Sequence, residues 1–294
     1  MTSYFSNLKL RFLQKDLLIR LILINIAVFL LFGIVMVIST LFKLNWFDAC
    51  LNFVAVPADL HQLLTHPWTL FTYMFAHYSI WHILFNMLVL YWFGQLFLDY
   101  FTQRNLGSLY LLGGLSGALL YIIAFNTIPY YIDLGYSTMV GASASVTAIL
   151  FASAFYNPQR RINLFIFGSV KILYIALFIF ILDFLSLASD KNPGGGVAHI
   201  GGAIIGYIFA VRYRNGYDIT RWIGNILDFV ANIFKPKTKL KVKKANKREA
   251  DYQYNQRKHN ESEEIDHILD KIRASGYGSL TKDEKKKLFD ASNK

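Results

Sequence analysis

Cysteine is almost absent from this chain of 294 residues, because Cys50 is the only one. A single cysteine excludes an intrachain disulfide and a metal site of the CxxC type. Glutamate is missing ahead of Glu249, so the acidic residues before it are all aspartates. No cleavable signal peptide is evident, because the first apolar run is long and lacks an A-x-A-like cleavage site. We expect that run to stay as an anchor.

The chain is rich in long apolar runs and poor in charged residues. Hydrophobic residues make up 54% of the chain and charged residues 17%. This composition is too apolar for a soluble domain of this size, and the runs are long enough to cross a bilayer. The sequence predicts an all-α, polytopic membrane protein. The six expected spans are 17–41, 79–101, 105–126, 141–157, 168–188 and 197–213.

Basic residues alternate between the loops and indicate the orientation. One set of loops holds most of them: Lys9, Arg11, Lys15, Arg20, Arg104, Arg160, Arg161, Lys171, Arg212 and Arg214. The opposite loops hold only Lys43 and Lys191. The positive-inside rule then places both termini in the cytoplasm. We expect a multi-pass protein of the cell membrane, with the segment 42–78 outside and partly in the membrane interface.

Four polar side chains fall at one depth in this topology. The second, fourth and sixth spans run from outside to inside and carry "HYSIWHILFN", "GASAS" and "VAHIGG" near their outer ends. His82, Asn86, Ser143 and His199 therefore lie about 5–10 Å below the outer surface, at 1.5 Å per residue. Polar groups are costly in lipid and usually face the protein interior. Their common depth predicts an assembled site.

The residue types at this depth suit acyl transfer. The Ser143 hydroxyl is a weak nucleophile until a base such as the His199 imidazole takes its proton. Attack on a carbonyl creates an oxyanion that needs fixed donors. His82 and Asn86, four residues apart on one helix face, could supply them. Taken alone, however, each residue has a structural explanation, and small residues such as Ser143 commonly line helix contacts in membranes.

The motifs "HxxxN", "GASA" and "AHxxGxxxG" occur in this order in the second, fourth and sixth spans. This arrangement resembles the rhomboid intramembrane serine proteases, over residues 10 to 213. The resemblance implies a six-span bundle in which Ser143 is the nucleophile and His199 the general base. It also implies that His82, Asn86 and the backbone N–H of Ser143 stabilise the oxyanion. Gly141, Gly202, Gly206 and His77 match structural positions of the family, and the resemblance implies no metal or other cofactor.

Two positions depart from the common pattern of the family. Ala144 stands where many relatives have glycine, and Thr147 stands where many carry an aromatic ring that stacks on the histidine. Asp183 is the one acid well inside a span. A third triad member is conceivable there, but the resemblance implies a dyad, so we expect Asp183 to make an interfacial or structural hydrogen bond.

The polar tail is organised differently from the apolar part. Residues 218–234 predict an amphipathic helix on the inner membrane surface, and the basic run 235–248 is suited to anionic lipid or to a solvated linker. We expect no nucleic acid partner, because the run lacks interleaved aromatic residues. Apolar spacing from Ile265 to Ile272 predicts a helix ending at Gly276. "TKDE" at 281–284 predicts a capping box for a second helix.

These observations predict a catalytic core over 1–214, an interfacial helix and basic linker over 215–260, and a cytoplasmic helix pair over 261–294. The predicted function is a serine endopeptidase whose substrates are single-span membrane proteins cut in or near their membrane segment. A non-catalytic relative that binds or escorts membrane clients is the alternative. A transporter or channel would require polar groups through the full membrane thickness. Oligomeric state is not predicted.

Overall fold

The fold is described from a computed structural model of the chain. It describes residues 16–135, 137–164, 168–188, 194–233 and 247–292. Lys9, Arg11, Lys15, Lys191 and most of the basic run 235–248 lie outside these residues. The chain forms two compact units, Met1–Lys235 and Pro236–Lys294.

The first unit is helical. Its helices are α2 (Leu17–Leu41), α3 (Trp46–Val54), α4 (Leu60–Thr65), α5 (Thr69–Thr72), α6 (Ile80–Leu98), α7 (Gln103–Thr127), α8 (Pro129–Asp133), α9 (Ser143–Tyr156), α10 (Ile172–Leu185), α11 (Gly195–Arg214) and α12 (Arg221–Ile233). Two short 3₁₀ turns, η1 (Tyr73–Phe75) and η2 (Ser186–Ala188), accompany them.

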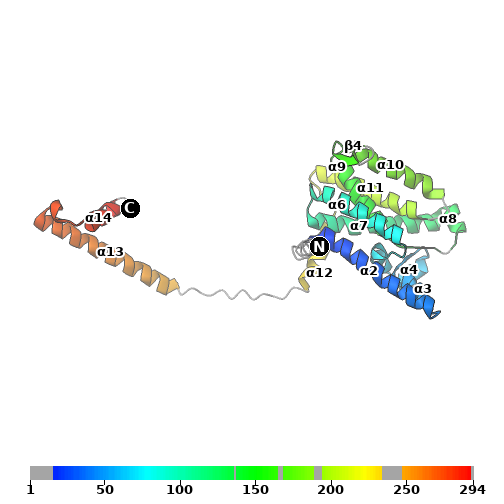
Figure 1. The fold of residues 1–294 in the computed structure, drawn as a ribbon, viewed down its shortest axis with the longest axis horizontal. Helices are drawn as coiled ribbons and strands as arrows, with labels where there is room; N and C mark the ends of the chain where they lie inside the picture. The colour runs from blue at the N-terminus through cyan, green and yellow to red at the C-terminus, as the bar shows by residue number, and fades with distance from the viewer. Residues whose placement is uncertain (1–15, 136, 165–167, 189–193, 234–246, 293–294) are drawn as a thin grey trace. The chain divides into compact units, whose positions relative to one another are not determined.

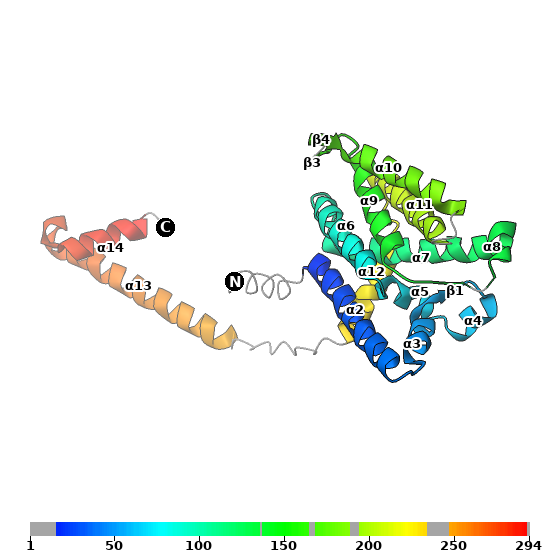
Figure 2. The same ribbon diagram turned by 45° about the vertical axis from the view of Figure 1, so that its right-hand side comes forward.

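Helices α7, α9 and α11 form the centre of this unit (Figure 1). Every residue of α9 from Ala144 to Ala154 is buried. Alanine, serine and glycine on these helices allow their backbones to approach closely, as is common where membrane helices pack. Figure 2 shows α10 along one side of the group and α2 along the other. Two of the four candidate side chains, Ser143 and His199, therefore come from this enclosed group, and His82 and Asn86 come from the neighbouring α6.

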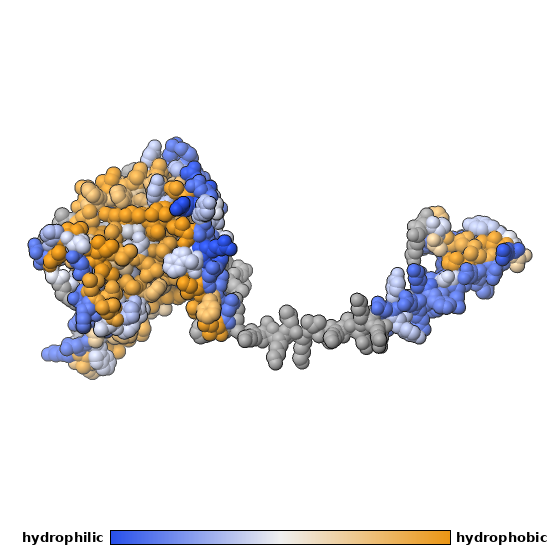
Figure 3. All heavy atoms as spheres, turned by 180° about the vertical axis from the view of Figure 1, so that it is seen from behind, coloured by the Kyte–Doolittle hydropathy of each residue, from blue (hydrophilic) through white to orange (hydrophobic). Residues whose placement is uncertain are grey.

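The outer surface of the first unit is strongly apolar. Figure 3 shows a broad hydrophobic face with hydrophilic residues gathered at its edges. Among the described residues, α2, α6, α7 and α11 are long and apolar enough to cross a membrane, and α9 and α10 are shorter apolar helices. Each of the six expected spans overlaps one of these helices, but the first four residues of the expected span 168–188 form a strand and α10 begins only at Ile172. The protein is thus a multi-pass helical membrane protein, and the count of six crossings stays a prediction.

Short strands interrupt the expected all-helical pattern. β1 (Val56–Pro57) pairs antiparallel with β2 (Thr138–Met139), and β3 (Arg161–Leu164) pairs antiparallel with β4 (Gly168–Lys171). The first pair joins segments far apart in the sequence, and such pairing depends on tertiary contacts rather than on local pattern. It connects the segment 42–78 to the chain just ahead of Ser143.

Helix α12 packs against α7 and leaves an apolar face exposed. Ile223 is buried, and Arg104 of α7 forms an ion pair with Asp228 at 2.9 Å and donates a hydrogen bond to Asn225 at 2.7 Å. The exposed apolar side chains of α12 are Trp222, Ile226, Phe229, Val230 and Ile233. This two-sided pattern suits a helix that lies in a membrane interface, as the sequence predicts.

The second unit contains α13 (Lys247–Ser275), η3 (Tyr277–Ser279) and α14 (Lys282–Ser292). α13 ends before Gly276, which has a φ of 75°, a left-handed conformation that favours glycine. α13 is longer than the apolar spacing of 265–272 suggests and runs continuously through residues 260 and 261, the predicted boundary between the linker and the helix pair. Its earlier turns lack an apolar stripe, so periodicity could not reveal them.

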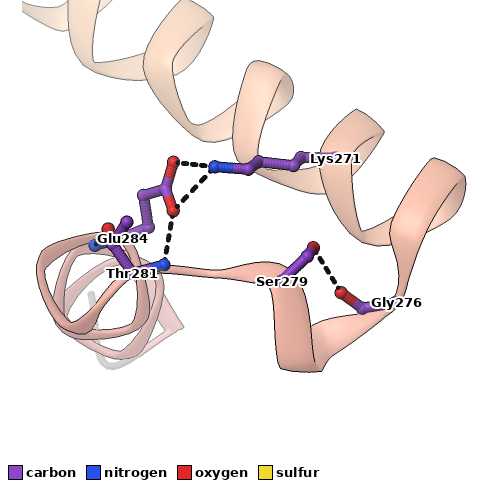
Figure 4. A network of polar contacts seen from close by, with 5 residues as sticks. All are labelled: Lys271, Gly276, Ser279, Thr281 and Glu284. Carbon is purple, nitrogen blue, oxygen red and sulfur yellow. Dashed lines mark hydrogen bonds and ion pairs between the residues drawn. The ribbon is translucent and has the colours of Figure 1, made fainter.

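The capping box predicted at the start of α14 is confirmed. The N–H of Thr281 donates to Oε2 of Glu284 at 2.7 Å, and the N–H of Glu284 donates to Oγ1 of Thr281 at 3.3 Å. Lys271 of α13 donates to both carboxylate oxygens of Glu284 at 2.9 and 3.2 Å (Figure 4). Glu284 therefore joins the two helices as well as capping one.

Acid should loosen this junction. The hydrogen bond from Lys271, assisted by that from the Thr281 backbone, lowers the pKa of Glu284 from its ordinary 4.5 to about 2. A lowered carboxylate pKa gives a stabilisation that is present above the unfolded pKa and is lost as the pH falls toward 2. We expect the protection factor of the Thr281 amide against hydrogen exchange to fall in this window, measured against E284A, which removes the acceptor and should be unprotected throughout. The control E264Q removes only the Lys287–Glu264 ion pair and should leave the amide protected; equal protection in E284A would contradict the prediction.

Candidate active site

Ser143 is the first residue of α9, and its side chain is partly buried. The turn before it contains Gly141 at a φ of 125°, where side chains other than glycine's are strained. A Cβ atom at Gly141 would lie 2.6 Å from Cε1 of His82. Glycine therefore allows the His82 ring to lie directly against the backbone that leads into Ser143.

Buried groups hold this turn in place. The backbone carbonyl of Tyr73 accepts a hydrogen bond from the N–H of Gly141 at 2.9 Å. The Tyr73 hydroxyl in turn donates to a backbone carbonyl of α7 at 2.6 Å. Nε2 of His77, which is buried, accepts from the N–H of Ala142 at 3.3 Å. The position of Ser143 is thus determined by contacts to α7 and to the loop ahead of α6.

His199 lies in the second turn of α11 and is partly buried. A Cβ atom at Gly202 would overlap the backbone oxygen of Ala144, and one at Gly206 would overlap that of Ala148. Both contacts are with α9. Larger residues would force the two helices apart, so this glycine pair allows α11 to approach the helix that begins at Ser143.

Asp183 of α10 contacts the His199 imidazole. Nδ1 of His199 and Oδ1 of Asp183 are 2.7 Å apart, and the two side chains are only 23% and 15% exposed. An ionised carboxylate can only accept hydrogen bonds, so the proton is assigned to Nδ1. Nε2 is then the ring nitrogen that remains for a second partner.

His82 and Asn86 lie one turn apart near the start of α6. Nδ2 of Asn86 donates to the backbone carbonyl of His82 at 2.9 Å, and the Asn86 side chain is buried. An amide nitrogen carries two hydrogens, so this bond leaves a second N–H. The His82 ring is packed between Gly141 and the ring of His77, whose centroid is 5.0 Å away.

Two cavities meet at Ser143. One, of about 380 Å³, lies between α6 and α10 and is lined by Ser143, His199, His82, Asn86 and Asp183 together with mostly apolar side chains. The other, of about 270 Å³, is more polar and more enclosed, and is lined by Ser143, His82, Gly141, Tyr73 and Tyr78. The structure thus brings the four polar residues of the second, fourth and sixth expected spans to one cavity.

The matching family model is the Rhomboid domain, which covers residues 64–215. That range contains α6, α7, α9, α10 and α11, and with them all the side chains that line the cavity between α6 and α10. The chain belongs to the rhomboid family. A second model, a family of unknown function (DUF6576), matches residues 248–294, which is most of the second compact unit.

Two rhomboid relatives come from Arabidopsis thaliana. RHOMBOID-like protein 12, mitochondrial, is 30% identical over 213 residues, which is 69% of this chain and 60% of the relative. RHOMBOID-like protein 1 is 31% identical over 155 residues, which is 51% of this chain and 36% of the relative. This rhomboid therefore spans 60% or less of the length of these curated relatives.

Sequence reasoning missed some of the groups that shape this rhomboid site. Tyr73 and Tyr78 line the polar cavity but occur in an aromatic segment with no motif. Asp183, the one acid well inside a span, was expected to make a structural or interfacial hydrogen bond; its carboxylate lies 2.7 Å from Nδ1 of His199, a partner that the sequence did not indicate. In the part of the chain that the structure describes, no three metal-binding side chains converge.

Proposed function

We propose that this rhomboid is a serine endopeptidase that cuts single-span membrane proteins in or near their membrane-spanning segment. The observation that supports this most strongly is the cavity between α6 and α10. A hydroxyl, two imidazoles and an amide line it, from three different helices. Packing alone would not require these three kinds of group to line a common, mostly apolar cavity.

The geometry suits a Ser–His mechanism. Nε2 of His199 takes the proton from Oγ of Ser143 while that oxygen attacks the carbonyl carbon of the scissile bond. The resulting oxyanion accepts hydrogen bonds from His82, from the free N–H of Asn86 and from the Ser143 backbone. Collapse of the intermediate breaks the C–N bond, and His199 returns the proton to the leaving amine. Water then cleaves the acyl-enzyme by the same steps.

The two cavities offer separate routes to Ser143. The apolar cavity opens between α6 and α10, and Trp81, Phe85 and Ile179 line it. An extended segment of a membrane protein could reach the serine from that side. The polar cavity beside Tyr73 and Tyr78 suits the water needed for deacylation. Substrate and water would thus meet at Ser143 from different sides.

The proposed topology has six spans with both termini in the cytoplasm and the site near the external face of the cell membrane. α9 has 14 residues and is therefore about 21 Å long, whereas the hydrocarbon core is about 30 Å thick. A helix of this length can begin below the membrane surface. Ser143, as its first residue, would then lie at a shallow depth that water can reach.

A fluorophosphonate probe tests the proposal. Such a probe phosphonylates a serine hydroxyl only where a neighbouring base activates it. We expect the wild-type protein in detergent or liposomes to be labelled, and S143A to lose the label completely. S145A is the matched control, because Ser145 is buried in the same helix without a hydrogen-bond partner among the described residues. An unlabelled wild type would contradict the proposal and favour a protein that binds or escorts membrane clients.

A further inference from the structure

We infer that Asp183 is a positioning residue for His199, so that the site works as a triad rather than a dyad; this inference rests on the proposed function. The contact that carries it is the 2.7 Å hydrogen bond between Nδ1 of His199 and Oδ1 of Asp183. A bond to Nδ1 determines which ring nitrogen carries the proton and which way the ring faces. With Nδ1 engaged, Nε2 is the nitrogen presented to Ser143.

The backbone around Asp183 is held as firmly as its side chain. The Ser186 hydroxyl donates to the backbone carbonyl of Asp183 at 2.7 Å. A Cβ atom at Gly196 would lie 2.8 Å from that same carbonyl oxygen. The end of α10 is therefore packed tightly against the start of α11, where His199 lies. The carboxylate is part of a defined junction between two helices and not a side chain on a free surface.

The negative charge of Asp183 has a partner inside the protein. An ionised side chain inside a membrane-spanning helix is costly and is typically paired. The titratable side chains that line the cavity with His199 are Asp183 from α10 and His82 from α6. When His199 takes the serine proton it becomes a cation, and a carboxylate 2.7 Å away stabilises that cation more strongly than it would in water.

Thr147 shows why the ring needs such a partner. Its side chain is buried and lines the cavity that holds His199. A threonine has neither the flat surface nor the size to fix an imidazole by stacking. The hydrogen bond from Asp183 of α10 can supply the orientation that a neighbouring ring would otherwise provide.

The test compares variants of Asp183 by the kinetics of fluorophosphonate labelling. D183N keeps the shape and removes the charge, and its amide can present a donor to Nδ1. We expect the maximal labelling rate to fall about 10- to 100-fold in D183N and D183A, with probe affinity and the thermal unfolding midpoint little changed. D183E, which restores the charge, should recover much of the rate. S186A loosens the same helix end without touching the ring and should label within about 2-fold of wild type.

The outcomes separate this inference from the proposed function. A labelled wild type together with an equally fast D183N supports a serine protease and overturns the role of Asp183. Equal losses in D183N, D183E and S186A, with lower unfolding midpoints, show a merely structural contact and overturn it as well. An unlabelled wild type overturns the proposed function and this inference with it.

Discussion

Alanine at Ser143 or at His199 is expected to lower the cleavage rate by about 10⁵- to 10⁶-fold, and alanine at both positions by no more than either alone. The two side chains act as one unit, because the hydroxyl is inert without its base and the base has no task without the hydroxyl. What remains after either change is the contribution of binding and of the oxyanion donors, which neither change removes.

The measurement is cleavage of single-span membrane proteins in proteoliposomes, with S143A, H199A and the double variant side by side. S145A and H61A are the matched controls: Ser145 is buried in α9 without lining either cavity at Ser143, and His61 is exposed on α4. Losses that multiply in the double variant would contradict a shared step. So would an H199A protein that keeps the wild-type rate.

Alanine at His82 or Asn86 is expected to lower kcat by about 10²- to 10³-fold each, with KM little changed, because an oxyanion donor contributes mainly in the transition state. The resting structure already holds Asn86 toward His82, through the bond from its amide to the His82 carbonyl at 2.9 Å. The donors are thus preorganised on one helix, and their loss should act on the chemical step.

Asn126 offers a matched control for Asn86. It lies on α7, and its Nδ2 donates to the backbone carbonyl four residues earlier, at Ile122, at 2.8 Å, as Asn86 does in α6. N126A removes the same kind of helix bond away from the cavity, together with a second bond to the Ala58 carbonyl at 2.9 Å, and should leave kcat within a few-fold of wild type. If N126A and N86A lowered kcat equally, the effect of Asn86 would be one of helix stability and not of oxyanion stabilisation.

The membrane-spanning helices could be read from the sequence because they depend on local composition. Apolar runs form helices in lipid, where each backbone group must find its partner within the segment. The ends of α2 and α11 fall within two residues of the expected limits. The cap at Thr281 and Glu284 was equally predictable, because both partners lie within one helical turn.

Contacts between distant segments were not predictable in this way. Nothing in the pattern around Tyr73 indicates that its carbonyl holds Gly141, or that Val56 pairs with Met139 ahead of the serine. The strands β3 and β4 are short, and their apolar flanks resemble the ends of helices. Each of these features depends on how helices pack against one another. Such packing leaves no periodic pattern in a single sequence.

Some features of the candidate site were predictable from the sequence, and others were not. Residue types, order and spacing were sufficient to select Ser143, His199, His82 and Asn86, because helical geometry converts position along a span into depth. The partner of the imidazole was a matter of tertiary structure. Asp183 meets His199 where Gly196 lets α10 and α11 approach at one end of the bundle. The energy of that close approach depends on both helices, so neither segment reveals it alone.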